Sequence, residues 1–182
     1  MGKKVLGVFF LMSVLLFAAC SHWPDTVRHT LSHDTGINDD AYGYDGRPWE
    51  IATHFTSTEL SPYVGEKIVS VRVFIATVPT TLSLKVYKGG AITPSTPAVV
   101  DQAVSASILA PDSWNEIVLS TPPIIANDEY WIGFSENVSG KIILGADAGP
   151  AHAEGDWQNL NGGVWVHLGA GRNWNIQAII SD

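Results

Sequence analysis

The chain has 182 residues, of which 10 are Lys or Arg and 18 are Asp or Glu, so its formal net charge at pH 7 is −8. This acidic balance provides no basic patch for a phosphate backbone, and it excludes nucleic acid as an expected partner. The sequence contains one Cys, so no intramolecular disulfide can form, and stability has to come from apolar packing or from a metal ion.

The N-terminal residues have the pattern of an export signal. Two Lys residues at positions 3 and 4 precede the uncharged stretch 5–19. That stretch is shorter than the roughly 20 residues that a membrane-spanning helix needs, which favours a cleaved signal over a membrane anchor helix. We therefore expect residues 1–19 to be removed during export.

The end of this stretch, Phe17-Ala18-Ala19-Cys20, resembles the lipobox of bacterial lipoproteins, with Phe17 where Leu is usual. The resemblance implies that Cys20 becomes the mature N-terminus and carries acyl chains such as palmitate. Ser21 is not the Asp that retains many Gram-negative lipoproteins at the inner membrane. We expect an exported protein that is lipid-anchored at the outer membrane or cell surface. An ordinary cleaved signal that happens to contain a Cys is the alternative.

Residues 20–45 are polar and show no period of 2 or 3.6, so we expect a tether that ends in an acidic loop. The loop is rich in carboxylates and Gly and lacks Lys and Arg, a composition that suits calcium, which binds six to eight oxygens in loose geometry. The predicted ligands are Asp34, Asn38, Asp39, Asp40 and Asp45, with Asp147 as a distant partner. The spacing does not fit an EF-hand, and a solvated loop without an ion is the alternative.

From residue 46 to residue 182, apolar side chains recur with period 2, which is typical of half-buried β-strands. Turns rich in Gly, Pro and Asn separate the segments. About nine strands are expected, at 49–55, 69–75, 82–86, 98–104, 114–119, 130–134, 141–144, 164–168 and 174–180. The pattern predicts an all-β domain over 46–182, built as an antiparallel β-sandwich.

One segment predicts a helix. Thr56-Ser57-Thr58-Glu59 fits the capping box, in which the Thr side chain and the Glu side chain each bond the other residue's backbone amide. Pro62 limits the helix to one or two turns, because Pro has no amide proton to donate. We expect one short helix near 57–64.

Several separated strings carry a family resemblance. They include Glu50-Ile51-Ala52-Thr53-His54-Phe55-Thr56, Glu129-Tyr130-Trp131-Ile132-Gly133, Asp147-Ala148-Gly149-Pro150, Gly155-Asp156-Trp157 and Asn173-Trp174-Asn175-Ile176. Together they resemble the jelly-roll β-sandwich modules of secreted bacterial surface proteins, similar to the adhesin-type domains attached to large extracellular proteases. The resemblance covers roughly 45–182 and implies a binding or structural module without an established catalytic set.

The chain contains seven Trp residues, and Trp often provides a flat platform for sugars or a hot spot for proteins. Three are in phase with apolar stripes and are expected in the core: Trp49, Trp114 and Trp174. Three others are out of phase or in a loop and are expected on an exposed ligand-binding face: Trp131, Trp157 and Trp165. Alternatively, an out-of-phase Trp covers the end of a sheet without binding a ligand.

Catalytic motifs are scarce. The sequence contains neither G-x-S-x-G nor H-E-x-x-H. His152-Ala153-Glu154 with Asp156 suits either a metal or an acid/base pair, and a polar surface loop is the simpler interpretation. We expect a non-enzymatic module that binds a glycan or a surface protein. The alternative is a small hydrolase, or a hydrolase accessory module, acting on envelope polysaccharide, which would require two perturbed carboxylates in one cleft.

Overall fold

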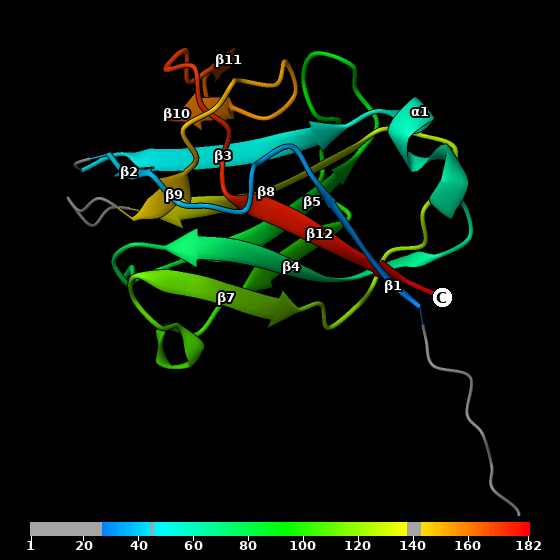
Figure 1. Cartoon of the computed structure of the whole chain (residues 1–182), viewed down its shortest axis with the longest axis horizontal. Helices are drawn as coiled ribbons and strands as arrows, with labels where there is room; N and C mark the ends of the chain where they lie inside the picture. Colours follow the sequence, from blue (N-terminus) through cyan, green and yellow to red (C-terminus); the bar gives the residue numbers. More distant parts are fainter. Residues whose placement is uncertain (1–26, 45, 138–142) are drawn as a thin grey trace, which may run out of the picture.

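A computed structural model describes residues 27–44, 46–137 and 143–182 of the chain. Twelve strands occur in these ranges, and they form two antiparallel sheets of six strands each (Figure 1). The predicted all-β sandwich is confirmed. All nine predicted strand segments overlap observed strands, although several boundaries differ by a few residues.

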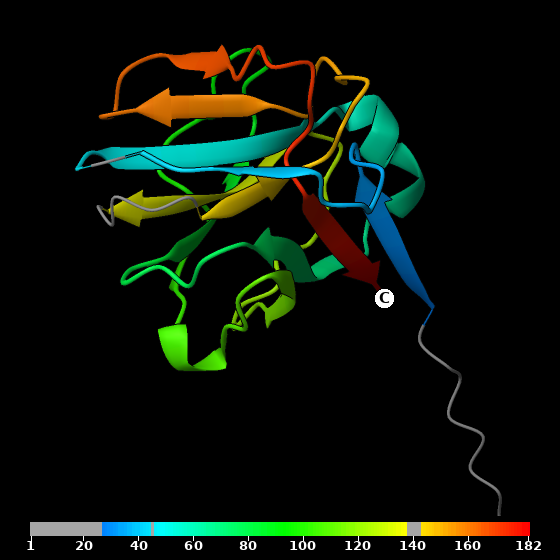
Figure 2. The same ribbon diagram turned by 60° about the vertical axis from the view of Figure 1, so that its left-hand side comes forward.

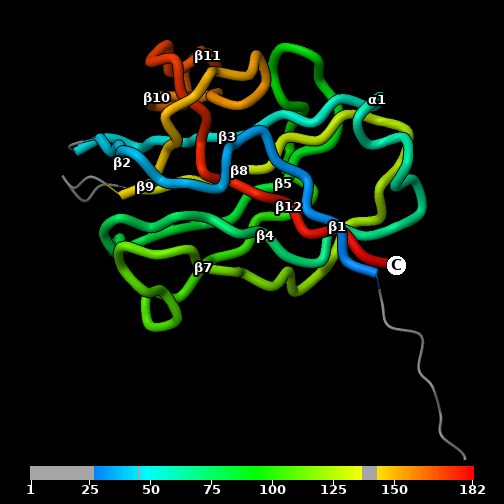
Figure 3. The backbone as a smooth tube through the Cα atoms, in the orientation of Figure 1, coloured from blue at the N-terminus to red at the C-terminus, as the bar shows by residue number. Residues whose placement is uncertain are grey.

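The first sheet, sheet A, has the order β1-β12-β4-β9-β2, and β7 pairs with β4 off this path. Its strands are β1 (Arg28–Ser32), β2 (Asp40–Tyr42), β4 (Lys67–Ile75), β7 (Ser113–Val118), β9 (Leu144–Ala146) and β12 (Ile176–Ser181). The two ends of the described chain therefore lie side by side, because β1 pairs with β12 along its whole length (Figure 3).

The second sheet, sheet B, has the order β11-β10-β3-β8-β5-β6. Its strands are β3 (Pro48–Phe55), β5 (Ser83–Lys88), β6 (Val100–Ala103), β8 (Tyr130–Asn137), β10 (Trp157–Leu160) and β11 (Trp165–His167). Figure 2 shows the orange β11 and β10, the cyan β3 and the yellow-green β8 as successive strands of this layer.

The facing sides of the sheets enclose one apolar core. Its residues follow the period-2 pattern, since alternate side chains of a strand share a face. Trp49 and Trp174 are buried in the core, with ring centroids 5.5 Å apart and ring planes at 74°. Their predicted burial is confirmed.

The predicted helix is present as α1 (Ser57–Leu60), followed by the 3-10 turn η1 (Ser61–Tyr63). The capping box forms as expected, because Thr56 accepts from the Glu59 amide and Glu59 accepts from the Thr56 amide. Leu60 anchors the helix by burying its side chain in the core.

Two short strands, β1 and β2, were not expected in the predicted tether and loop over 20–45, and the residues between them are not in a strand. Both strands belong to sheet A, and a third unexpected strand is β10. β1 and β2 are short, and their side chains are only half-buried or exposed, so hydrophobic periodicity was too weak to reveal them. Residues Arg28–Ser32 and Asp40–Tyr42 therefore belong to the sandwich.

The export signal, Cys20 and Asp45 lie outside the described residues. Within the described ranges, no helix has the length and apolar character needed to cross a membrane.

Candidate functional site

Two of the three Trp residues predicted on an exposed face are buried. Trp131 is 0% exposed and Trp157 is 8% exposed, so the expectation that the out-of-phase Trp131 and the loop residue Trp157 are accessible was wrong. With Ala52 and Tyr87 they form a second apolar cluster on the outer side of sheet B. Trp165 is half-buried and packs against this cluster, with its ring centroid 5.6 Å from that of Trp131.

Loops cover the outer face of sheet B, which explains the burial. The Trp131 indole N–H donates to the Gly90 carbonyl at 2.6 Å, and the ring stacks on His54 at 4.4 Å. The Trp157 indole N–H donates to Glu154 at 3.0 Å. Glu154 also contacts Nδ1 of His54 at 2.6 Å, so the loop before β10 is bound to the sheet through polar contacts.

Trp114, which was expected in the core, is half-buried on β7 at the edge of sheet A. Its ring packs edge-on against Phe74 and lies under the Arg72 guanidinium at 5.2 Å. It is a partly exposed Trp on the other sheet, away from the aromatic cluster of sheet B.

A groove crosses sheet B at the end where β3 begins. It consists of two adjoining depressions of about 250 and 270 Å³ that share Glu50, Asn159 and Gly162. Five groove residues are paired with one another across five neighbouring strands, so they form one row. They are Trp165, Asn159, Glu50, Ser135 and Ser83. At about 4.8 Å between strands, the row is roughly 19 Å long. We call this feature the sheet B groove.

The groove contains a half-buried carboxyl group. Glu50 accepts a hydrogen bond from the Tyr87 hydroxyl at 2.5 Å. Burial raises the pKa of Glu50 above its usual range, although the Tyr87 bond opposes that effect. Burial, together with the bond to Glu50, also raises the pKa of Tyr87, which therefore remains a phenol donor at neutral pH.

Asn159 provides an acceptor without a donor. Its amide N–H₂ donates to the Gly163 carbonyl at 2.9 Å, whereas its buried Oδ1 has no hydrogen-bond partner. Asn159 is only 9% exposed, and an unsatisfied buried acceptor costs about 1–3 kcal/mol.

Sequence reasoning missed Glu50, Tyr87 and Asn159 as site residues. The parity that assigned Trp49 to the core also places Glu50 on the opposite face, so Glu50 was recoverable. Asn159 was not, because it lies on β10, which was interpreted as a loop.

Five of the six predicted calcium ligands are described, and two of them pair with a basic side chain. Asp39 and Asp40 pair with Arg172, at 2.5 and 3.7 Å. Among the described residues, none of the predicted calcium ligands belongs to a group of three or more His, Cys, Asp or Glu side chains that lie close enough to share a metal ion.

Asp34, Asn38 and Asp147 lie in one hydrogen-bonded neighbourhood. Asp147 accepts from the Thr35 amide, and Asn38 accepts from the Asn175 side chain, each at 2.9 Å. Asp34 Oδ2 and Asn175 Oδ1 are buried acceptors without a donor, which is the kind of oxygen that calcium would satisfy. Calcium binding stays a prediction, now restricted to this neighbourhood.

No protein-family model and no curated protein matches the sequence. Among solved structures, the chain is similar to the clostridial cysteine protease Cwp84 after propeptide cleavage, with a TM-score of 0.56 and 13% identity. The match covers 85% of this chain and 40% of the protease chain. At this identity the likeness shows a shared β-sandwich fold, and the adhesin-type and lipoprotein assignments stay predictions.

Proposed function

We propose that the protein is a lipid-anchored, extracytoplasmic β-sandwich module that binds a neutral glycan in the sheet B groove. Two carboxyl groups line the groove, Glu50 and Glu136. We favour binding over catalysis because the Glu50 carboxyl group accepts from the Tyr87 hydroxyl. A hydrolase that uses the two carboxyl groups is the alternative. The fold match to part of a protease chain also fits an accessory module, since the shared region accounts for less than half of that chain.

The single observation that carries this proposal is the groove itself, in which Trp165 lies in one row with the polar residues Asn159 and Glu50. Ligand sites combine apolar surface with a few polar groups that fix orientation. Here the indole offers a face for a sugar ring, while Asn159, Glu50 and Ser135 offer hydrogen-bonding groups. A neutral ligand is favoured because the chain has a net charge of −8 and two carboxyl groups, Glu50 and Glu136, line the groove.

Replacing Trp165 by Ala should weaken glycan binding by about 2 kcal/mol or more, roughly thirty-fold, because the aromatic platform is lost. A glycan array probed with the full chain in detergent would identify the ligand, and calorimetry would give the affinity. Trp114→Ala is the matched control, since Trp114 is also half-buried but lies on sheet A. Its affinity should equal that of the unmodified protein.

Two results would contradict the glycan proposal. Equal affinities for Trp165→Ala and the unmodified protein would remove the groove as the site. Release of reducing ends from envelope polysaccharide, abolished in Glu50→Gln, would instead favour the hydrolase alternative.

Replacing Cys20 by Ser should release the protein from the membrane fraction, because the lipid attachment site is lost. Fractionation of cells that produce each form, followed by immunoblotting, measures this. Ser21→Ala is the control and should remain in the membrane fraction. A processed Cys20→Ser protein that still sediments with membranes would show that the anchor is not at Cys20.

A further inference from the structure

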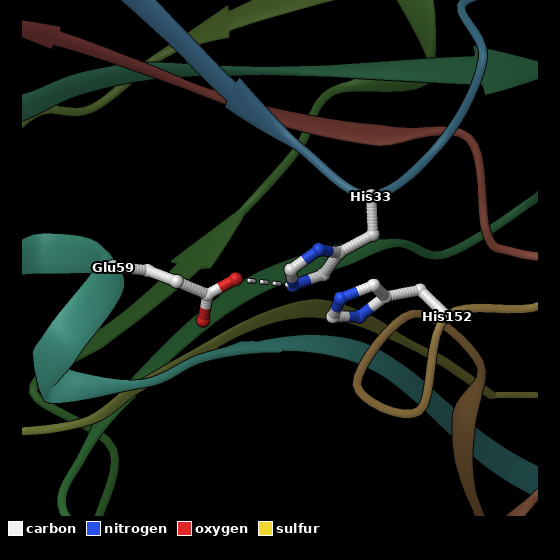
Figure 4. Close-up of side chains that lie close together, drawn as sticks. All are labelled: His33, Glu59 and His152. Atoms are coloured by element: carbon white, nitrogen blue, oxygen red, sulfur yellow. Dashed lines mark ion pairs between the residues drawn. The ribbon is translucent and has the colours of Figure 1, made fainter.

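Three ligand-type side chains meet at the end of β3 that carries α1, away from the sheet B groove. They are His33 after β1, Glu59 in α1 and His152 in the loop before β10, and Figure 4 shows them pointing toward one another. One donor atom from each lies within 4.8 Å of the other two. The two imidazole rings are nearly parallel, with centroids 3.9 Å apart, and His33 Nε2 lies 3.8 Å from Glu59 Oε1.

The capping box holds the Glu59 carboxylate in place. Glu59 Oε2 accepts from the Thr56 amide at 2.8 Å and from the Thr56 hydroxyl at 2.7 Å. Oε1 faces His33. Hydrogen bonds that orient a carboxylate in this way are typical of the partners that support metal ligands.

The donor atoms of the three groups suit a cation. Each His offers a ring nitrogen, and Glu59 offers a carboxylate oxygen. Two imidazoles and one carboxylate form a ligand set that zinc accepts.

We propose that His33, Glu59 and His152 bind a divalent transition-metal ion of the zinc type. Tetrahedral zinc with bonds of about 2.0–2.1 Å places its ligand atoms roughly 3.4 Å apart, so the three side chains must move closer together. One imidazole ring must also turn out of the parallel stack, because the metal has to lie in the plane of each ring. The nitrogen and oxygen donors favour zinc over calcium, which prefers oxygens alone. The fourth position is left to water.

Binding requires two hydrogen-bond contacts to change. His33 Nε2 lies 2.9 Å from the His54 carbonyl oxygen, and the Glu154 amide donates to His152 Nδ1 at 3.2 Å. The metal therefore replaces protein hydrogen bonds instead of filling a prepared cage, and we expect reversible binding.

The site would join three segments that are distant in the sequence. The ligands connect the short edge strand β1 to α1 and to the loop that covers the Trp131 cluster. Because the unfolded chain lacks this arrangement, the ion binds the native state and raises its melting temperature. It would serve as a cross-link in a chain that has one Cys.

The test uses the full chain, stripped of metal with a chelator and titrated with Zn²⁺ by calorimetry and thermal unfolding. We expect one zinc per chain, a rise in melting temperature and, with Co²⁺, a visible absorption band of tetrahedral coordination. His152→Gln should weaken zinc binding by about tenfold or more and remove the Co²⁺ band. His152 is exposed, so this substitution leaves the core unchanged.

Two further variants distinguish a loss of metal binding from a loss of local structure. Glu59→Gln preserves the capping box, which accepts Gln at this position, and should weaken zinc binding without melting α1. His29→Gln is the control, because His29 lies on β1 but packs on Tyr63, outside the cluster. Calcium bound near Asp147 would raise the melting temperature equally with and without His152.

The proposal is overturned if zinc affinity and the Co²⁺ spectrum are the same in His152→Gln, Glu59→Gln and the unmodified protein. It is also overturned if His29→Gln weakens binding as much as His152→Gln does, since zinc would then be held elsewhere.

Discussion

Replacing Trp131 by Ala should lower the free energy of unfolding by about 3–5 kcal/mol, as expected for truncation of a fully buried aromatic side chain. The ring is 0% exposed and packs between His54, Trp157 and Trp165. The variant would also leave the Gly90 carbonyl without its indole donor. Urea unfolding measures the effect as a lower midpoint at an unchanged denaturant slope.

Trp165→Ala is the comparison, because Trp165 belongs to the same cluster but is half-buried. Its loss of stability should be clearly smaller than that of Trp131→Ala. Trp131→Phe keeps most of the apolar volume and tests the hydrogen bond to Gly90 separately, with an expected cost of about 1–3 kcal/mol. A loss below about 1 kcal/mol for Trp131→Ala would mean that the loops do not close over sheet B.

Strand periodicity predicted the inner faces of the sandwich well. Along β3, Trp49, Ile51 and Phe55 are all buried in the core. Period 2 has a direct physical cause, since successive side chains of a strand point to opposite faces. It identifies which side chains share a face, and that was enough to recover the core.

The same periodicity could not tell whether an outer face is open to solvent. Trp131 was assigned correctly to the face opposite the core, and it is nevertheless buried. The covering loops are irregular, and their attachment depends on contacts such as Trp131 to Gly90, which are 41 residues apart. Only the tertiary structure brings these groups together.

Long-range pairing also gave two of the predicted calcium ligands a basic partner. Asp39 and Asp40 were grouped with Asp34 because they are close in the sequence, but Arg172 approaches from 133 residues away and pairs with both. The same kind of convergence created the cluster of His33, Glu59 and His152. Motif spacing predicted neither the Arg172 pairs nor the cluster of His33, Glu59 and His152, because these residues are farther apart in the sequence than any motif extends.

Replacing Asp147 by Ala should lower the free energy of unfolding by about 3–5 kcal/mol, because buried N–H donors would lose a charged acceptor. Asp147 is fully buried, and its carboxylate accepts from the amides of Thr35, Gly149 and Asn173 at 2.8–2.9 Å. These bonds join the segment after β1 to the segments before β10 and β12. Chemical denaturation at pH 7 measures the loss.

Asp39→Ala is the matched control, since its carboxylate is exposed and pairs with Arg172 at the surface. Surface ion pairs contribute about 0–1 kcal/mol, so this variant should remain close to the unmodified protein. Similar losses in the two variants would show that the amide contacts of Asp147 do not hold the three segments together.

The pH dependence of stability gives a second test of Asp147. Its amide donors outweigh burial and lower its pKa below the ordinary value of 3.8, so the native state favours the carboxylate. The resulting stabilisation is complete well above pH 3.8 and is lost as the pH falls through the native pKa. Burial raises the pKa of Asp34, whose contribution has the opposite sign, so the total curve mixes the two effects. The difference between the unmodified protein and Asp147→Asn isolates Asp147, because Asn does not titrate, and this difference should shrink toward acid pH. A difference independent of pH would mean that Asp147 acts through packing instead of charge.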